Sequence, residues 1–110
     1  VDMFDCVMPT RNGRNAMIFT ANGIMNMRNR KWQDDFSPID IDGPCSLDRT
    51  YTKAYLHHLF KAQELLALEI ASIHNLSFYL WLTGEARKHI LAGDFRAWKE
   101  VMVKRVTERL

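Results

Sequence analysis

The chain has 110 residues, of which 47% are hydrophobic and 25% charged, a composition typical of one small globular domain. The aromatic share of 11% argues against intrinsic disorder, and no run approaches the ~18 consecutive apolar residues of a membrane span. A net charge of +2 is too weak to indicate nucleic-acid binding by itself, although residues 51–110 carry nine basic and six acidic side chains.

The cysteine content and the first residues bear on where the protein works. Two cysteines are too few for a disulfide framework, and no signal peptide is visible, so we expect a cytoplasmic protein that does not associate with membranes. The chain starts at Val1, inside an apolar run. This start favours a fragment of a longer protein.

The first part of the chain predicts short β structure. Residues 1–8 are mostly apolar and end at a proline, which indicates a buried strand. Residues 9–15 are polar and contain an Asn-Gly pair, which is typical of a turn-rich loop. Two β-type runs at residues 16–20 and 24–27 are separated by Ala-Asn-Gly, and this spacing predicts an antiparallel hairpin.

Helices are predicted after an irregular connection at residues 29–50, which prolines and a glycine interrupt. Thr52 can cap a first helix that runs to about residue 68. Residues 68–73 either continue that helix or form a short strand. A second helix is expected over 78–92, closed by a glycine, and a third over 94–107.

Three residues near the N-terminus have chemistry that invites a functional interpretation. Asp5 lies between apolar neighbours, where a carboxylate is costly unless it is paired or used as a nucleophile or base. The alternative is a strand-end aspartate that bonds the following loop. Arg11 and Arg14 flank a glycine-containing loop, and guanidinium groups bind phosphates and base edges well. They can equally be solvated surface residues.

The residues that could bind a metal are Cys45, Asp48, His57, His58 and His74. They match no familiar zinc spacing, and the one thiolate among them has no thiolate partner, so the pattern alone does not favour a metal. The adjacent histidines point about 100° apart on a helix, which predicts that one packs inside and the other faces solvent.

Four segments together resemble one family. Residues 1–15 (VDMFDCVMPTRNGRN) are similar to the active-site segment of bacterial tRNA-guanine transglycosylases, also called queuine tRNA-ribosyltransferases. Residues 24–29, 54–59 and 73–76 resemble further family motifs in the same order and spacing. The resemblance implies an α/β fold class, an irregular TIM barrel, of which this chain would be the C-terminal third. Three parts would follow: a late barrel strand, active-site loop and hairpin at 1–28, a degenerate zinc subdomain at 29–50, and a helical region at 51–110.

The resemblance also implies a function. The family exchanges the wobble guanine of tRNA for a 7-deazaguanine, preQ1 in bacteria, through a covalent enzyme–RNA intermediate. On this basis Asp5 is the nucleophile, and Thr10, Arg11 and Arg14 read bases of the anticodon loop. The implied partners are tRNA, the guanine or 7-deazaguanine base, and a second copy in a homodimer. Alternatives are a non-catalytic partner subunit, against which retention of Asp5 argues, and an RNA-binding or dimerisation module.

The chain departs from the family pattern in two respects. The family holds a structural zinc with three cysteines and one histidine, but the matching positions here are Gly43, Cys45, Asp48 and His74. We therefore expect zinc to be absent or weakly bound, and name no cofactor. The family's acid/base aspartate lies upstream, so the 110 residues alone are predicted to be inactive. Without barrel neighbours the chain should be mostly helical with a small hairpin, and residues 1–8 should be displaced, frayed or paired to another copy.

Overall fold

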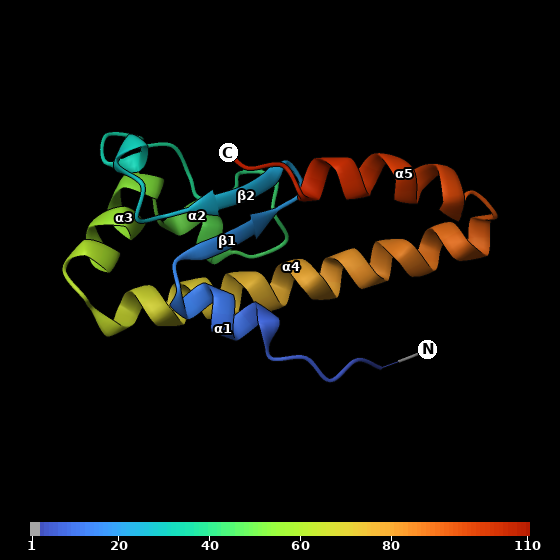
Figure 1. Cartoon of the computed structure of the whole chain (residues 1–110), viewed down its shortest axis with the longest axis horizontal. Helices are drawn as coiled ribbons and strands as arrows, with labels where there is room; N and C mark the ends of the chain where they lie inside the picture. The colour runs from blue at the N-terminus through green and yellow to red at the C-terminus, as the bar shows by residue number, and fades with distance from the viewer. Residues whose placement is uncertain (1–2) are drawn as a thin grey trace.

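The computed structural model describes residues 3–110, and it is mostly helical with one small antiparallel sheet (Figure 1). This agrees with the overall prediction for the chain. The elements follow in the order α1 (Met8–Arg14), β1 (Met17–Thr20), β2 (Gly23–Asn26), the 3-10 helix η1 (Arg30–Trp32), α2 (Leu47–Thr50), α3 (Lys53–Lys61), α4 (Leu65–Ala92) and α5 (Phe95–Val106).

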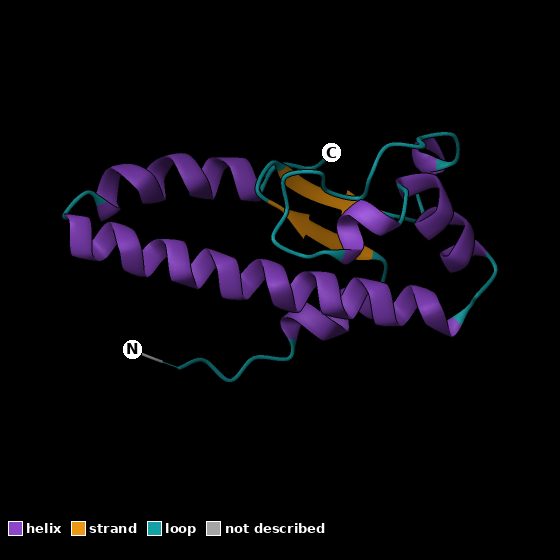
Figure 2. Ribbon diagram, turned by 180° about the vertical axis from the view of Figure 1, so that it is seen from behind, coloured by secondary structure: helices purple, strands orange, loops and turns teal. Residues whose placement is uncertain are grey.

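The long helix α4 is the element on which the others are arranged. One half of α4 carries α1 on one side and the hairpin with α3 on another, and its other half runs antiparallel to α5 (Figure 2). The result is elongated, with extents of 46 × 25 × 21 Å. The core lies between the hairpin, α3 and the first half of α4, where apolar side chains of all three are buried, among them Ile18, Met25, Leu56 and Ile70.

The hairpin forms where the sequence predicts it. Met17 pairs with Asn26 and Thr20 with Gly23, so the turn is made by the two residues between the strands. The chain returns to this sheet at its end, because Ile24 and the last residues exchange backbone hydrogen bonds, from Ile24 N to Glu108 O at 2.7 Å and from Leu110 N to Ile24 O at 3.0 Å. Gly23 has a φ of 143°, and a Cβ there would lie 2.6 Å from Glu108 O, so only glycine allows this approach.

The strand predicted for residues 1–8 and the loop predicted for 9–15 are wrong in the part of the chain that the structure describes. Residues 3–7 have no regular structure, which agrees with fraying, and α1 follows; residues 1–2 lie outside the described part. Pro9 occupies the first turn of α1, where its missing N–H costs nothing. Gly13 serves close packing instead of a turn, since a Cβ there would lie 3.1 Å from the backbone carbon of Ala71.

The predicted helix ends are partly confirmed. Thr52 caps α3, and its hydroxyl accepts a hydrogen bond from Tyr55 N at 3.1 Å. Gly93 ends α4 with a left-handed φ of 84°, and α5 follows. The first helix ends earlier than predicted, at Lys61, and no strand or break separates residues 68 and 78, because α4 is continuous.

By length and composition, α4 is apolar enough to cross a membrane. A stretch of 18 residues within it has a mean hydropathy of 1.3, and 33% of that stretch is buried inside the protein. The same test is passed by helices that pack on a core. This helix buries His74 and Asn75 inside the protein, where both bond to the hairpin. The expected absence of membrane association stays a prediction.

Candidate active-site segment and metal position

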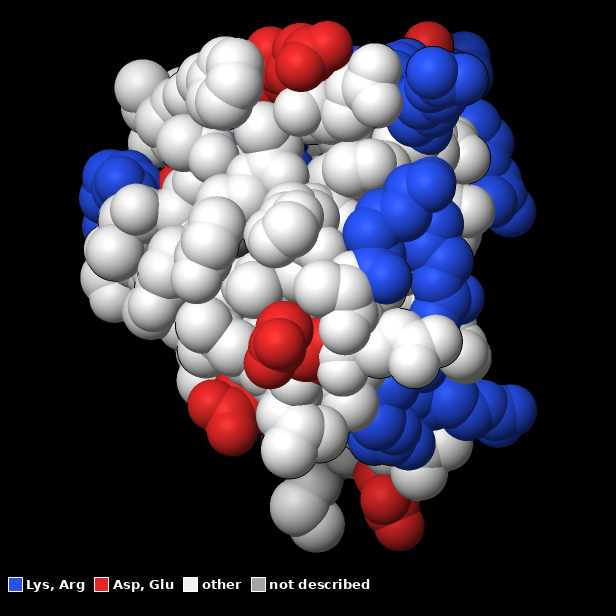
Figure 3. All heavy atoms as spheres, turned by 90° about the vertical axis from the view of Figure 1, so that its left-hand side faces the viewer, with Lys and Arg blue, Asp and Glu red and all other residues white. Residues whose placement is uncertain are grey.

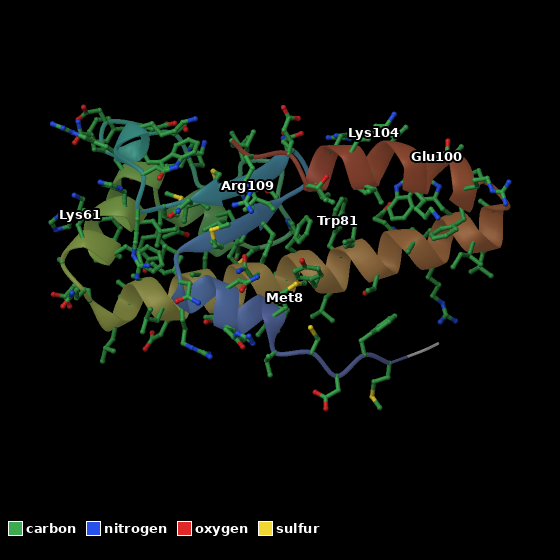
Figure 4. All side chains as sticks on the ribbon, in the orientation of Figure 1. Met8, Lys61, Trp81, Glu100, Lys104 and Arg109 are labelled. Atoms are coloured by element: carbon green, nitrogen blue, oxygen red, sulfur yellow. The ribbon has the colours of Figure 1, made fainter. Side chains whose placement is uncertain are left out.

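Asp5 lies on the segment that leads into α1. Its residue is exposed, and residues 3–7 run from Met8 away from the body of the molecule (Figure 4). Thr10, in the first turn of the helix, donates its hydroxyl hydrogen to Val7 O at 3.3 Å and so ties the segment to α1. The carboxylate predicted to act as nucleophile is therefore accessible to a large ligand.

The two arginines predicted to contact RNA share one face of α1. Arg11 and Arg14 are three residues apart in its last turn and are exposed, whereas Pro9 and Gly13 are buried against the body. Neither arginine forms an ion pair with any residue in the range 3–110. Both guanidinium groups are therefore available to an anionic ligand on the side of α1 that faces away from α4.

Further basic residues lie at the end of the molecule formed by η1 and α3. Arg28, Arg30 and Lys31 are exposed in or beside η1, and Lys61 is exposed at the end of α3. Figure 3 looks onto this end and shows Lys and Arg side chains gathered along one side of it. This surface adds positive charge to the same half of the protein that carries α1.

Asn75 anchors α1 and β1 to α4. Its side chain is fully buried and makes three hydrogen bonds: Oδ1 accepts from Phe19 N at 3.1 Å, and Nδ2 donates to Pro9 O at 3.0 Å and to Met17 O at 2.9 Å. The sequence pattern had not assigned this role to Asn75.

Asp48 and His74 form a hydrogen-bonded pair inside the protein. His74 Nδ1 lies 2.6 Å from Asp48 Oδ1, and the two side chains are 1% and 0% exposed. The other ring nitrogen, Nε2, lies 2.7 Å from the carbonyl oxygen of Phe19. Because a carbonyl oxygen only accepts, Nε2 carries a hydrogen, and the contact between Nδ1 and Oδ1 must hold a second one. The pair thereby joins β1, α2 and α4.

A second carboxyl group lies close to this pair. Asp48 Oδ2 has no hydrogen-bond partner among the described residues. A Cβ on Gly43 would lie 2.6 Å from that oxygen and 2.8 Å from Asp40 Oδ2, so both carboxyl groups crowd this glycine. Burial, and then the neighbouring charge of Asp48, raise the pKa of Asp40 above its ordinary value. No sequence motif marks Asp40 as part of this cluster.

The residues at the zinc positions do not fit a structural zinc ion. Gly43 offers no side-chain ligand, Cys45 is buried, and Asp48 and His74 bond each other. Across residues 3–110 no group of three or more His, Cys, Asp or Glu side chains is placed to hold a metal ion. Structural zinc sites use four protein ligands, so the set is incomplete.

The two adjacent histidines divide as predicted. His57 is buried, and its Nδ1 donates to Met27 O at 2.7 Å, whereas His58 is exposed. Cys6 is exposed, and its sulfur accepts a hydrogen bond from Met8 N at 3.4 Å. None of these residues joins the Asp48–His74 pair.

Comparison with known proteins places the chain in a family. A sequence model described as "Queuine tRNA-ribosyltransferase" matches residues 1–108. Proteins of that name from Aquifex aeolicus and Helicobacter acinonychis are 46% identical over 110 residues and 49% identical over 107, which is 100% and 97% of this chain. One from Clostridium kluyveri is 44% identical over 98% of the chain. In each case the match covers 29% of the relative's own length. The chain belongs to the queuine tRNA-ribosyltransferase family.

Proposed function

We propose that this chain supplies the C-terminal part of a tRNA-guanine transglycosylase, which exchanges the wobble guanine of tRNA for a 7-deazaguanine such as preQ1. The observation that carries the proposal is the family match over residues 1–108, which contains an exposed carboxylate followed by two exposed arginines on one helical face. By the same resemblance, we expect the full-length enzyme to be a cytoplasmic homodimer. Light scattering of the purified enzyme would test the dimeric state.

Asp5 has the chemistry that such an exchange needs. Its carboxylate oxygen would bond to C1′ of the ribose as the bond from C1′ to guanine N9 breaks, and the electron pair would leave with the guanine. A proton from an acid outside these 110 residues would neutralise the departing base. The incoming 7-deazaguanine would then attack C1′ through its own ring nitrogen, return one proton and release Asp5, so that no net proton is consumed.

Arg11 and Arg14 would hold the RNA beside this carboxylate. Bases in an RNA loop can be splayed out and recognised at their edges, and the target nucleotide must leave the stack before Asp5 can reach its sugar. A fixed helix that presents two guanidinium groups on one face suits this task, because their hydrogen-bond donors are not used by ion pairs within the described protein.

Trapping the covalent intermediate tests the proposal. A full-length family enzyme containing this chain is incubated with an anticodon stem–loop RNA and separated on a denaturing gel. We expect Asp5→Asn to lose both the covalent band and the exchange of labelled guanine while it still binds the RNA. Asp34→Asn, a change at another exposed carboxylate, should retain all three properties. A covalent band that persists in Asp5→Asn would refute the assignment.

The arginines are tested by binding. Arg11→Ala and Arg14→Ala should each weaken RNA binding, and a residue that contacts phosphate should reduce the slope of log affinity against log salt by about 1. Arg96→Ala, at an exposed arginine of α5, is the matched control. Unchanged affinity in both α1 variants would contradict the role of that helix in RNA binding.

A further inference from the structure

The distances around His74 exclude zinc more strongly than the missing cysteines do. In a tetrahedral site, ligand atoms bound at about 2.0–2.1 Å from zinc lie roughly 3.3 Å from one another. His74 Nδ1 and Asp48 Oδ1 are 2.6 Å apart, which leaves room for a hydrogen but not for a metal ion between them. The other nitrogen is occupied as well, because Nε2 donates to Phe19 O at 2.7 Å.

The Asp48–His74 hydrogen bond connects the two elements that a metal would have to connect, and the bond from His74 to Phe19 adds β1 to them. Asp48 belongs to α2, which accepts a backbone hydrogen bond from Ile39 N at 3.0 Å and so holds the irregular connection in place. His74 belongs to α4, and Phe19 to β1. All of these atoms are buried, where hydrogen bonds are strong and unpaired partners are costly.

Gly43 shows that the substitutions in this chain fit one another. A side chain at position 43 would place its Cβ 2.6 Å from Asp48 Oδ2 and 2.8 Å from Asp40 Oδ2. Residue 43 does not have a left-handed φ, so no backbone constraint requires glycine there. Glycine leaves this space to the two carboxyl groups, whereas a cysteine at 43 would force the side chains of Asp40 and Asp48 to move.

We propose that the region corresponding to the family's zinc subdomain is held against α4 and β1 without metal, through the hydrogen bonds that join Asp48, His74 and Phe19. In this proposal, Gly43 and Asp48 together replace two zinc-binding cysteines. The protein is therefore insensitive to chelators. The proposal does not depend on the catalytic role of Asp5, so the two can fail separately.

The test uses a full-length family enzyme containing this chain and reads out metal content and melting temperature instead of activity. We expect elemental analysis to find far less than one zinc per chain, and prolonged EDTA treatment to change the melting temperature by less than about 1 °C. Stoichiometric zinc, or a clear fall in melting temperature with EDTA, would overturn the proposal.

Two sets of variants sharpen the test. Asp48→Asn can donate to Nδ1 and should melt close to the wild type, whereas Asp48→Ala removes the partner and should melt several degrees lower, with or without EDTA. Equal melting temperatures of the two variants would show that this hydrogen bond does not stabilise the protein.

The double variant G43C/D48C restores three cysteines and a histidine. It should bind about one zinc per chain and melt lower after EDTA, while G43C alone should be the less stable of the two. A double variant that folds but takes up no zinc would refute the claim that these two positions replace the metal. If it does not fold, metal content and EDTA response of the wild type decide the question.

Discussion

Replacing Asn75 by aspartate, a side chain of almost the same shape, should weaken the attachment of α1 to the rest of the protein. Aspartate can still accept from Phe19 N, but it loses the amide group that donates to Pro9 O at 3.0 Å and to Met17 O at 2.9 Å. Even a protonated carboxyl group could donate to only one of these two carbonyl oxygens. The helix that carries both candidate RNA-binding arginines would thereby lose its buried anchor.

The expected cost follows from the bonds lost. A buried hydrogen bond contributes about 1 kcal/mol net, and a buried acceptor left without a partner costs about 1–3 kcal/mol. With two carbonyl oxygens affected, the Asn75→Asp change should lower the free energy of unfolding by about 3 kcal/mol. At a urea dependence of about 1.5 kcal/mol per molar for a protein of this size, the unfolding midpoint falls by about 2 M.

Urea titration followed by helix circular dichroism would measure this shift. Asn29→Asp, at an exposed asparagine, is the matched control and should leave the midpoint unchanged. Asn75→Ala, which leaves all three backbone groups unpaired, should be at least as unstable as Asn75→Asp. A midpoint for Asn75→Asp that equals that of the control would refute the idea that this side chain holds α1 in place.

Three further predictions concern packing, pH and activity. Gly13→Ala should destabilise the chain by about 1–3 kcal/mol, because its Cβ would lie 3.1 Å from the Ala71 backbone, whereas Gly84→Ala, in open space on α4, should be neutral or stabilising; equal urea midpoints would contradict this packing. Burial and Asp48 raise the pKa of Asp40 above its ordinary 3.8, so the native state binds more protons than the unfolded state just above that pH, and stability falls as pH rises through this window. Asp40→Asn should therefore raise the melting temperature at pH 7 and have no such effect at pH 3; a gain of equal size at both pH values would exclude titration as its cause. The isolated 110 residues should show a helical circular dichroism spectrum but no exchange of labelled guanine into tRNA, and turnover by this chain alone would show that no upstream residue is needed.

Local signals predicted the elements whose structure is determined locally. The Asn-Gly pair at the hairpin, the Thr52 cap and the glycine that ends α4 each act within a few residues, and all three are where the sequence places them. The Asn-Gly pair at residues 12–13 carries the same signal but lies in a helix, because contact with Ala71 decides the structure there. Sequence alone does not reveal which long-range contact will override a turn signal.

The polar residues inside α4 explain why its continuity was missed. The sequence left a short strand open at residues 68–73 and placed the next helix at 78, and the polar His74 and Asn75 lie between them. Both are buried within one continuous helix and bonded to the hairpin. From the sequence, Asp48 and His74 were interpreted only as an incomplete set of zinc ligands, not as partners in a hydrogen bond. The resemblance named Asp48 and His74 as candidates, but their hydrogen bonds depend on contacts between residues 26 or more positions apart, which no local pattern predicts.

The small sheet has partners along both of its outer sides. Along β1, the backbone groups of Met17 and Phe19 are bonded by side chains of α4, and along β2 the last residues of the chain bond Ile24. A strand edge with free N–H and C=O groups recruits other chains and seeds aggregation. Here a foreign strand would first have to displace a helix or the C-terminal residues, so the hairpin resists such recruitment although it has only two strands.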